Sequence, residues 1–552
     1  MANMDTDIKL SAFEATPLED IARYAASTRA AFESQKTKDV EWRLVQLRKL
    51  WWGITDYTPR FAAALKQDIG KPTFETVLME AATCLSDLNL ALKKLKTWVK
   101  DDTDLDYPLT FTPLKPRVRK EPLGPVLIIG PYNFPMMLCL APLVGAISAG
   151  CTAVIKPSES APATAMVIKE MVEKYLDPGS FYVVNGAIPE TSALLNEKWA
   201  KIFYTGNPTV ARIIAKKAAE SLTPVTLELG GRNPAFISKS ANLAMAARRL
   251  LWGKCANAGQ ICLSQNYVCI ERELVDDFIK YLNATYKEFF PKGAKASGDY
   301  SRIVNERQFD RIKKMLDTTK GKIVLGGETD RSELFIGPTV VLVDSIDDPM
   351  MVDESFGPIW SIYPVSDVKE AIKVMKKVDP TPLSLMTFGS SVENELVLSN
   401  VTSGGATIND AFMHGSIATL PFGGVGESGT GAYHGRASFD CFTHRRTVVV
   451  TPNWMDKLLR VRYLPHSQPD LKQFLWMNGV KPTFDRSGKE LKGVGYWAWM
   501  VLGLGGPSAK GALIRWIAVL AAYSVASQYY DIPIPFFNYH EQLNSLISKI
   551  RP

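Results

Sequence analysis

Residues 124–135 read GPVLIIGPYNFP, and this stretch decides the fold class. Its apolar, β-branched run at 126–130 is typical of a parallel strand that is buried on both faces. A segment of small residues follows at 141–150, and TAVIK at 152–156 then has the pattern of a second strand. Strand, helix and strand at this spacing predict a βαβ unit in a doubly wound α/β sheet.

The same alternation continues toward the C-terminus. Residues 235–445 keep the α/β character and predict a second α/β unit after the first. Further elements are expected as a helix at 161–176 and strands at 181–184, 201–206, 266–270 and 405–409.

The segment before the sheet has a different pattern. Apolar residues between 12 and 100 recur three and four positions apart, which predicts helices. Residues 101–122 are rich in proline and acidic side chains, so we expect a linker followed by an extended segment. Residues 1–10 contain two aspartates and no apolar run, which argues against a signal peptide.

Composition excludes several classes of protein. The chain has 552 residues, 46% hydrophobic and 22% charged, so it has the composition of a globular protein with three or four structural units of roughly 150 residues each. A net charge of +7 is mild for this size, and we expect no nucleic-acid partner. Seven cysteines without a CxxC pair exclude a disulfide scaffold and a zinc ribbon, and we expect no metal.

The last hundred residues differ sharply in composition. Residues 493–509 carry no charge, and residues 511–530 carry only Arg515. Because about 20 apolar residues span a bilayer as a helix, we predict membrane segments at both ranges. One span, a hairpin turning at 505–507, and an amphipathic helix beside the active-site entrance remain open. The alternative is a soluble helix packed on the core.

Three motifs place reactive side chains near the ends of strands. Cys262 lies in NAGQICLS, just before a strand, where a nearby cation or helix N-terminus can activate a thiol. Glu228 ends a strand in LELGGRNP, where a general base can be partly desolvated. Asn133 lies in the turn after the first strand and can donate to an oxyanion. Taken alone, each is more often structural: a buried thiol, an exposed cap or a turn residue.

Two further motifs suit a nucleotide. Lys156 and Glu159 in VIKPSE follow a strand at the carboxyl edge of the sheet, where they can hydrogen-bond ribose hydroxyls. A helix start capped by Ser158 is the alternative. Gly206 in FYTGNPTV lies between a strand and a helix start, as in pyrophosphate sites. The GxGxxG spacing at 424–429 lacks a preceding strand signal, so we reject it as a dinucleotide fingerprint.

Taken in order, the motifs of this chain resemble the aldehyde dehydrogenase superfamily from roughly residue 15 to residue 465. The ending at 429–446 resembles the class 3, fatty-aldehyde branch, and KPTFDRSGKELKG at 481–493 resembles fungal members. Tyr132 and Arg232 depart from the usual Trp and Lys, which affects only details of cofactor fit. The motifs that carry the resemblance are GPYNFP, IKPSE, FYTGNPTV, LELGGRNP, GQICLS, ESFGPIW and LPFGGVGESG.

The resemblance implies an enzyme that oxidises aldehydes with NAD, with NADP possible. It implies that Cys262 is the nucleophile, Glu228 the general base and Asn133 the oxyanion donor. The second carboxylate, Glu354, can share the role of base. The residues implied for cofactor binding are Lys156, Glu159, Gly206, Glu354 and Phe356.

The resemblance also implies a domain organisation and a homodimer. The expected fold combines a Rossmann-like cofactor domain, a second α/β catalytic domain, a small bridging or oligomerisation element and a C-terminal membrane segment. The expected ranges are 1–100 with 115–229 for the NAD(P)-binding domain, 101–114 for a bridging segment, 230–428 for the catalytic domain, 429–465 for the oligomerisation tail and 466–552 for the extension.

A membrane segment on such an enzyme predicts lipid-borne substrates. We expect long-chain fatty aldehydes such as hexadecanal or hexadecenal. The alternatives are an apocarotenoid aldehyde, beta-apo-4′-carotenal, and a non-catalytic membrane scaffold of the same fold. Basic residues at 486–492 precede the first segment and predict a catalytic domain facing the cytosol. The endoplasmic reticulum, the outer mitochondrial membrane and lipid droplets are equally compatible with this pattern.

Overall fold

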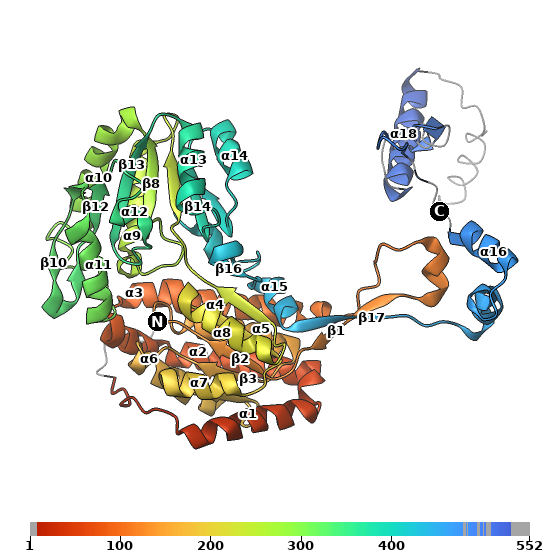
Figure 1. The fold of residues 1–552 in the computed structure, drawn as a ribbon, viewed down its shortest axis with the longest axis horizontal. Coiled ribbons are helices and arrows are strands. Elements are labelled where there is room, and N and C mark those ends of the chain that lie inside the picture. The colour runs from red at the N-terminus through yellow and green to blue at the C-terminus, as the bar shows by residue number, and fades with distance from the viewer. Residues whose placement is uncertain are drawn as a thin grey trace, which may run out of the picture. The chain divides into compact units, whose positions relative to one another are not determined.

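The computed structural model describes most of the chain (Figure 1). The chain divides into two compact units, Met1–Val450 and Thr451–Pro552. The described residues are 8–478, 482, 484–493, 497–498, 500, 502–503 and 509–530.

The first sheet is built around the strand predicted at 126–130. In the described part of the chain its strand order is β16-β6-β5-β2-β3-β4, and every pair is parallel except β16 with β6. This order confirms the doubly wound α/β arrangement. The strands are β2 (Val126–Ile129), β3 (Ala153–Lys156), β4 (Phe181–Val183), β5 (Lys201–Thr205), β6 (Val225–Glu228) and β16 (Gly429–Thr430).

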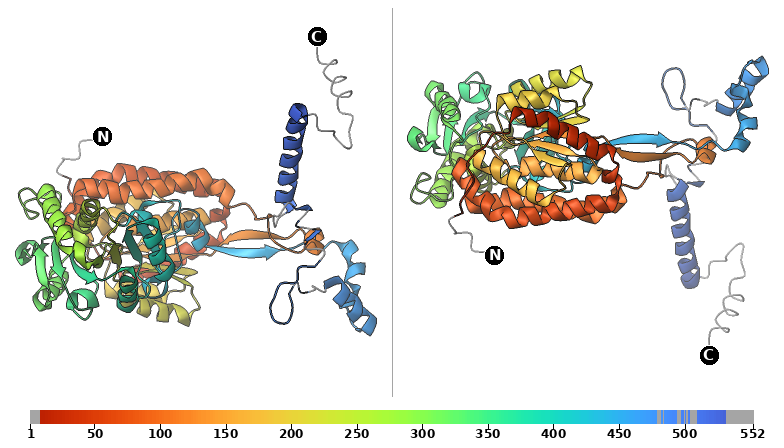
Figure 2. Two further views of the ribbon diagram at one scale, coloured as in Figure 1. Left: turned by 90° about the horizontal axis from the view of Figure 1, so that it is seen from above. Right: turned by 90° about the horizontal axis from the view of Figure 1, so that it is seen from below.

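Both faces of β2 are buried, as its apolar run requires. Val126 and Ile128 belong to one core with α2, α4, α5 and α6, whereas Leu127 and Ile129 belong to another with α1, α7 and α8. The long helix α2, orange-red in Figure 2, packs against α6. These helices are α1 (Leu18–Glu33), α2 (Val40–Ile69), α4 (Ala82–Trp98), α5 (Met137–Ala149), α6 (Pro162–Tyr175), α7 (Ile188–Asn196) and α8 (Pro208–Glu220).

A second sheet follows in the chain and has its own core. Among the described residues its order is β15-β14-β7-β8-β13-β12-β9, with only β9 antiparallel to its neighbour. Its strands are β7 (Pro234–Ile237), β8 (Tyr267–Glu271), β9 (Lys322–Leu325), β12 (Thr339–Leu342), β13 (Ile359–Val365), β14 (Ser384–Phe388) and β15 (Gly405–Ile408). The helices of this region are α9 (Leu243–Cys255), α10 (Val275–Phe289), α11 (Glu306–Thr318), α12 (Pro349–Val352), α13 (Val368–Val378) and α14 (Ser391–Asn400).

Smaller elements complete the first unit. The extended segment expected after the linker is β1 (Arg117–Pro122), which pairs antiparallel with β17 (Thr443–Val448). The 3-10 helix η8 (Gly426–Ser428) directly precedes β16, and this confirms that the local GxGxxG spacing does not open a βαβ unit. Further short elements are β10 (Thr329–Asp330), β11 (Phe335–Ile336), α3 (Thr73–Glu75) and α15 (Gly435–Cys441).

The second unit contains the 3-10 helix η9 (Asn453–Arg462), α16 (Gln468–Asn478) and α18 (Ala509–Tyr530). The segment predicted at 511–530 is helical, while most of the segment predicted at 493–509 lies outside the described residues. No helix in the described ranges has the length and apolar character needed to cross a bilayer. Arg515 interrupts the apolar run of α18, and its guanidinium donates to the carbonyl of Gly503.

Candidate active site

The candidate site lies beyond the carboxyl ends of β2, β5 and β6. The winding of the first sheet reverses between β2 and β5, and α/β sheets bind ligands in the crevice at such a reversal. The turn after β2 carries Asn133, Gly206 follows β5, and Glu228 is the last residue of β6.

Cys262 follows a loop with an unusual backbone. The last three residues of the 3-10 helix η4 (Ala256–Gly259) have φ of 50°, 49° and 69°, in the left-handed region. A Cβ on Gly259 would lie 2.2 Å from the carbonyl oxygen of Gly357, so only glycine permits this close approach. Consecutive left-handed residues are costly and persist where the surrounding structure holds them, often at functional sites.

Buried side-chain amides fix the loop around Cys262. Asn133 Nδ2 donates to the carbonyl of Gln260 at 3.0 Å. Asn233 Nδ2 donates to the carbonyls of Cys262 and Ser264 at 2.6 and 3.1 Å. A carboxamide has two N–H donors, and the second N–H of Asn133 has no acceptor in the described part of the chain. One N–H of Asn133 therefore remains free beside the loop that carries Cys262.

Protein atoms and two carboxylates surround the Cys262 thiol, although the residue keeps some accessible surface. Burial, followed by the negative charges of Glu354 and Glu228, raises the pKa of the thiol to about 12. The negative charges of Glu354 and Glu228 therefore act on the same thiol. At neutral pH the thiol holds its proton, which must leave before the sulfur can act as a nucleophile.

Glu228 is a buried carboxyl without partners. It is 2% exposed, and neither oxygen accepts a hydrogen bond from the described residues. Burial raises the pKa of this carboxyl well above its usual value. Because buried polar groups are nearly always hydrogen-bonded, two unpartnered oxygens near the Cys262 thiol indicate a group that meets water or substrate.

Glu354 lies against the two glycines that follow Glu228. A Cβ on Gly230 would lie 2.5 Å from Glu354 Oε2, and the backbone N–H of Gly231 donates to this carboxylate. Burial raises the pKa of Glu354 to about 7, opposed by that N–H, by Lys254 and by Arg311. Glu354 therefore titrates near neutral pH.

Phe356, two residues further on, is held against the turn that carries Asn133. Its φ is 40°, and its ring lies edge-on to Tyr132 with 6.1 Å between the centroids. Tyr132 is the residue that replaces the usual Trp. Phe356 and Glu354 thus lie beside the reactive residues, on the segment 353–356.

Lys156 and Glu159 form the part of the site that fits a nucleotide. Lys156 Nζ, 3% exposed, donates to the carbonyl of Pro157 at 3.0 Å and to Glu159 at 2.9 Å. Burial acts to raise the pKa of Glu159, but the Lys156 ammonium outweighs it and the pKa is lowered. An ammonium and a charged carboxylate at the end of β3, next to β2, suit the hydroxyls of a ribose. Gly206 lies at the same carboxyl edge of the sheet. Its backbone N–H donates to the carbonyl of Glu228 at 3.0 Å.

Residues 2–448 match the profile of the aldehyde dehydrogenase family. The chain belongs to the aldehyde dehydrogenase family. It is similar to the beta-apo-4′-carotenal oxygenase of Neurospora crassa, with 56% identity over 521 residues, 94% of this chain and 98% of that protein. Aldehyde dehydrogenase family 3 member H1 of Arabidopsis thaliana is 41% identical, over 80% of this chain and 92% of that protein. The resemblance to the class 3 branch and to fungal members is therefore confirmed.

A solved structure agrees with this assignment. The substrate-bound state of Staphylococcus aureus AldH has a TM-score of 0.76 and 37% identity, over 80% of this chain and 98% of that chain. The present enzyme is therefore an aldehyde dehydrogenase, an oxidoreductase that acts on aldehydes.

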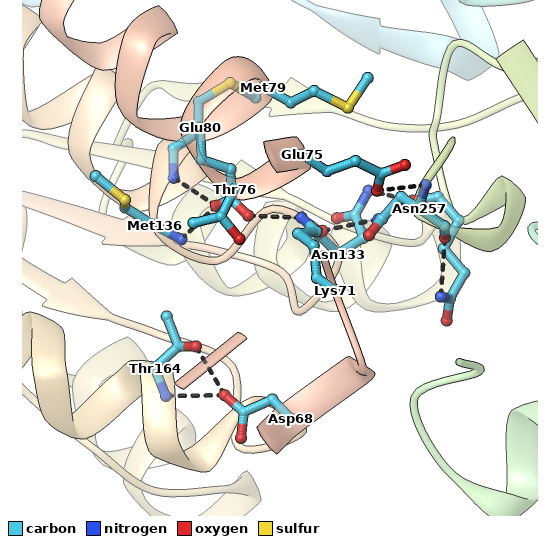
Figure 3. Close-up of polar contacts among 12 residues, drawn as sticks. Asp68, Lys71, Glu75, Thr76, Met79, Glu80, Asn133, Met136, Thr164 and Asn257 are labelled. Carbon is cyan, nitrogen blue, oxygen red and sulfur yellow. Dashed lines mark hydrogen bonds and ion pairs between the residues drawn. The ribbon is translucent and has the colours of Figure 1, made fainter. Parts of the chain in front are cut away.

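In this aldehyde dehydrogenase, a layer of polar side chains behind these residues was not predicted from the sequence. Lys71, Glu75 and Glu80 contact the turn of Asn133 and the loop before Cys262 (Figure 3). They lie in a stretch interpreted only as helical. Helical periodicity gave no signal for these residues, because Lys71 lies between α2 and α3 and has polar residues such as Asp68 and Glu75 at helical spacing.

The Glu354→Gln variant should alkylate faster at Cys262 than the wild type at pH 8. Above pH 7 the Glu354 carboxylate raises the pKa of the thiol, so a neutral amide lowers that pKa and increases the thiolate fraction. The measurement is the rate of iodoacetamide labelling of Cys262 by mass spectrometry. Glu228→Gln is the matched control and should accelerate labelling less, because Glu354 has the larger effect. Equal rates in wild type and Glu354→Gln would contradict the geometry.

Proposed function

We propose that this aldehyde dehydrogenase oxidises a long apocarotenoid aldehyde, of the beta-apo-4′-carotenal type, to the carboxylic acid. The observation that carries this proposal is the 56% identity to the Neurospora crassa beta-apo-4′-carotenal oxygenase, which extends over 94% of this chain. Long-chain fatty aldehydes, placed first by the sequence, are the second candidate because the class 3 resemblance favours them.

The residues around the first sheet fit NAD as the electron acceptor. Lys156 and Glu159 would hold the adenosine ribose, Gly206 would line the site, and Glu354 and Phe356 would hold the nicotinamide ribose. When bound, the nicotinamide supplies hydride acceptance. A carboxylate at Glu159 favours a free 2′-hydroxyl and repels a 2′-phosphate, so NAD should be preferred over NADP.

Cys262, Asn133 and Glu228 divide the chemistry of the aldehyde. The Cys262 thiol releases its proton to water, and its sulfur forms a bond to the aldehyde carbon while the carbonyl oxygen becomes the oxyanion of a thiohemiacetal. The free N–H of Asn133 and the backbone N–H of Cys262 donate to this oxyanion. Loss of hydride from the carbon leaves a thioester on Cys262. Glu228 then takes a proton from water, whose oxygen attacks the thioester and releases the acid and the thiol.

The Glu228→Gln variant should accumulate an acylated enzyme. Without the base, thioester hydrolysis should slow by roughly 10²–10⁴-fold, while acylation continues. Intact-mass spectrometry should detect an acyl adduct on Cys262 that the wild type does not accumulate. In the wild type, deacylation should accelerate with rising pH, because only the ionised form of Glu228 accepts a proton and its pKa is raised. Wild-type turnover in Glu228→Gln would assign the base to Glu354.

A substrate panel tests the proposed substrate class. The detergent-solubilised full chain is assayed for NADH formation with beta-apo-4′-carotenal, hexadecanal and hexanal, and Cys262→Ala is the control. We expect the highest kcat/KM for the apocarotenal and no activity of Cys262→Ala on any aldehyde. A higher kcat/KM for hexadecanal would make the fatty aldehyde the substrate.

We also propose that the C-terminal extension attaches the enzyme to membrane lipid, with the first unit in the cytosol. Large apolar side chains of α18 are exposed, including Leu513 (64%), Ile514 (66%) and Leu520 (61%).

We also propose that the enzyme forms a homodimer. The ribbon of β1 and β17 supports it: Asp102 bridges Val118 on the outer edge of β1, but the outer edge of β17 has no strand partner in the described ranges and can pair with another copy.

Deleting residues 493–552 should release the enzyme from membranes and keep its activity on short aldehydes. Cys262, Glu228 and Asn133 all lie in the first unit, so the chemistry should survive the truncation. Sedimentation after a carbonate wash measures attachment, and NADH formation with hexanal measures activity. If the truncated protein still sediments with membranes, the extension is not the anchor. A changed chain-length preference in detergent would indicate a role at the substrate entrance instead.

A further inference from the structure

A buried ion pair lies directly behind the turn that carries Asn133 (Figure 3). Lys71 and Glu80 are each 0% exposed, and Lys71 Nζ lies 2.6 Å from Glu80 Oε1. The same ammonium donates to the backbone carbonyl of Asn133 at 3.0 Å and lies 4.2 Å from the ring centroid of Phe134. A buried charge is tolerated only where its partners are complete, so this pair fixes the position of the Asn133 backbone.

The second oxygen of Glu80 holds the other end of the same turn. Glu80 Oε2 accepts the backbone N–H groups of Met136 and Met137 at 3.0 and 3.1 Å, at the N-terminus of α5. These N–H groups have no partner within the helix, and the carboxylate also matches the positive end of the helix dipole. Lys71 and Glu80 together therefore hydrogen-bond both ends of the turn from Asn133 to Met137.

Glu75 holds the loop on the other side of the site. Glu75 Oε2 accepts the backbone N–H of Asn257 at 3.0 Å. Asn257 has a φ of 50°, and its Nδ2 donates to the carbonyls of Asn133 and Gln260 at 2.9 and 3.1 Å. Glu75 thus supports a left-handed residue whose side chain joins the turn of Asn133 to the loop of Cys262.

The backbone of this segment explains why both acids reach the site. Residues Thr76–Ala81 form a π-helical turn, η2, between α3 and α4. A π turn closes its hydrogen bonds over five residues, so side chains five positions apart, such as Glu75 and Glu80, project to similar sides. Asp68 anchors the start of the segment, because its carboxylate accepts the N–H groups of Ala163 and Thr164 at the start of α6.

We propose that Lys71, Glu75 and Glu80 are positioning residues, which set the placement of the Asn133 amide relative to the Cys262 sulfur. They touch neither sulfur nor substrate and act through the backbones of Asn133 and Asn257. This inference rests on the proposed role of Asn133 as oxyanion donor. The position of an oxyanion donor affects the transition state more than the ground state, so these residues should affect kcat more than KM.

Lys71 is tested by a double-mutant cycle in the full-length, detergent-solubilised enzyme, using the aldehyde that the wild type turns over fastest. Lys71→Met should lower kcat by roughly 10–100-fold and change KM by less than about threefold. In an Asn133→Ala background the same substitution should cause little further loss, because the amide that it misplaces is already absent. A wild-type kcat in Lys71→Met, or losses that multiply in the double variant, would overturn the proposal.

Glu75 supplies a matched pair of variants. Glu75→Gln retains an oxygen that accepts the Asn257 N–H and should keep most of the wild-type kcat, whereas Glu75→Ala should lower kcat about tenfold or more. Thermal unfolding of each variant is measured in parallel, and equal losses of kcat in Glu75→Gln and Glu75→Ala would exclude a role through this hydrogen bond. A fall in unfolding temperature with unchanged kcat would show a purely structural role.

Two further controls keep the outcomes separate. If Lys71→Met does not fold, Lys71→Met/Glu80→Met removes both charges of the pair, and the same loss of kcat and the same lack of additivity with Asn133→Ala are expected. The proposed substrate class fails if the wild type does not oxidise beta-apo-4′-carotenal. The positioning role is tested separately with any aldehyde that the wild type oxidises. It is wrong if the variants have the same kcat as the wild type.

Discussion

The constraint on which the structure depends is that β2 has no exposed face. Helices cover the strand from both sides, with Val126 and Ile128 in one core and Leu127 and Ile129 in the other. Polar chemistry can therefore appear only where the strand ends, and the same applies to β3 and β5 beside it. The turn of Asn133, the pair Lys156 and Glu159, and Glu228 all take that position for this reason.

Burial at this edge has two opposite effects on the reactive groups. It raises the pKa of Cys262, Glu228 and Glu354, and so disfavours their charged forms. The same exclusion of water strengthens the hydrogen bonds that a developing oxyanion would receive. Exclusion of water therefore makes the thiolate harder to form, but it stabilises the oxyanion that forms when the thiolate attacks the aldehyde.

The sequence predicted features that depend on local pattern. The run VLIIG marked β2 because only a doubly buried strand tolerates it, and the motifs around Cys262, Glu228 and Asn133 were found because strand ends collect functional residues. The sequence did not indicate Lys71, Glu75 and Glu80, whose partners lie 62 positions away for Lys71, 182 for Glu75 and 56 for Glu80. Their burial is a product of tertiary packing, which helical periodicity does not report. The apolar run after Lys510 predicted a helix, but it did not predict what surrounds that helix.

The π turn at Thr76–Ala81 has a consequence for how the family can vary in this region. A π turn contains one residue more than the α-helical turn that it replaces. Deleting that extra residue would leave an α-helical turn and redirect the side chains within the segment, while the flanking helices kept their directions. Glu80, which lies in this turn, would then lose its present alignment with the N–H groups of Met136 and Met137. Insertions and deletions in this segment should therefore be rarer among homologues than amino-acid substitutions.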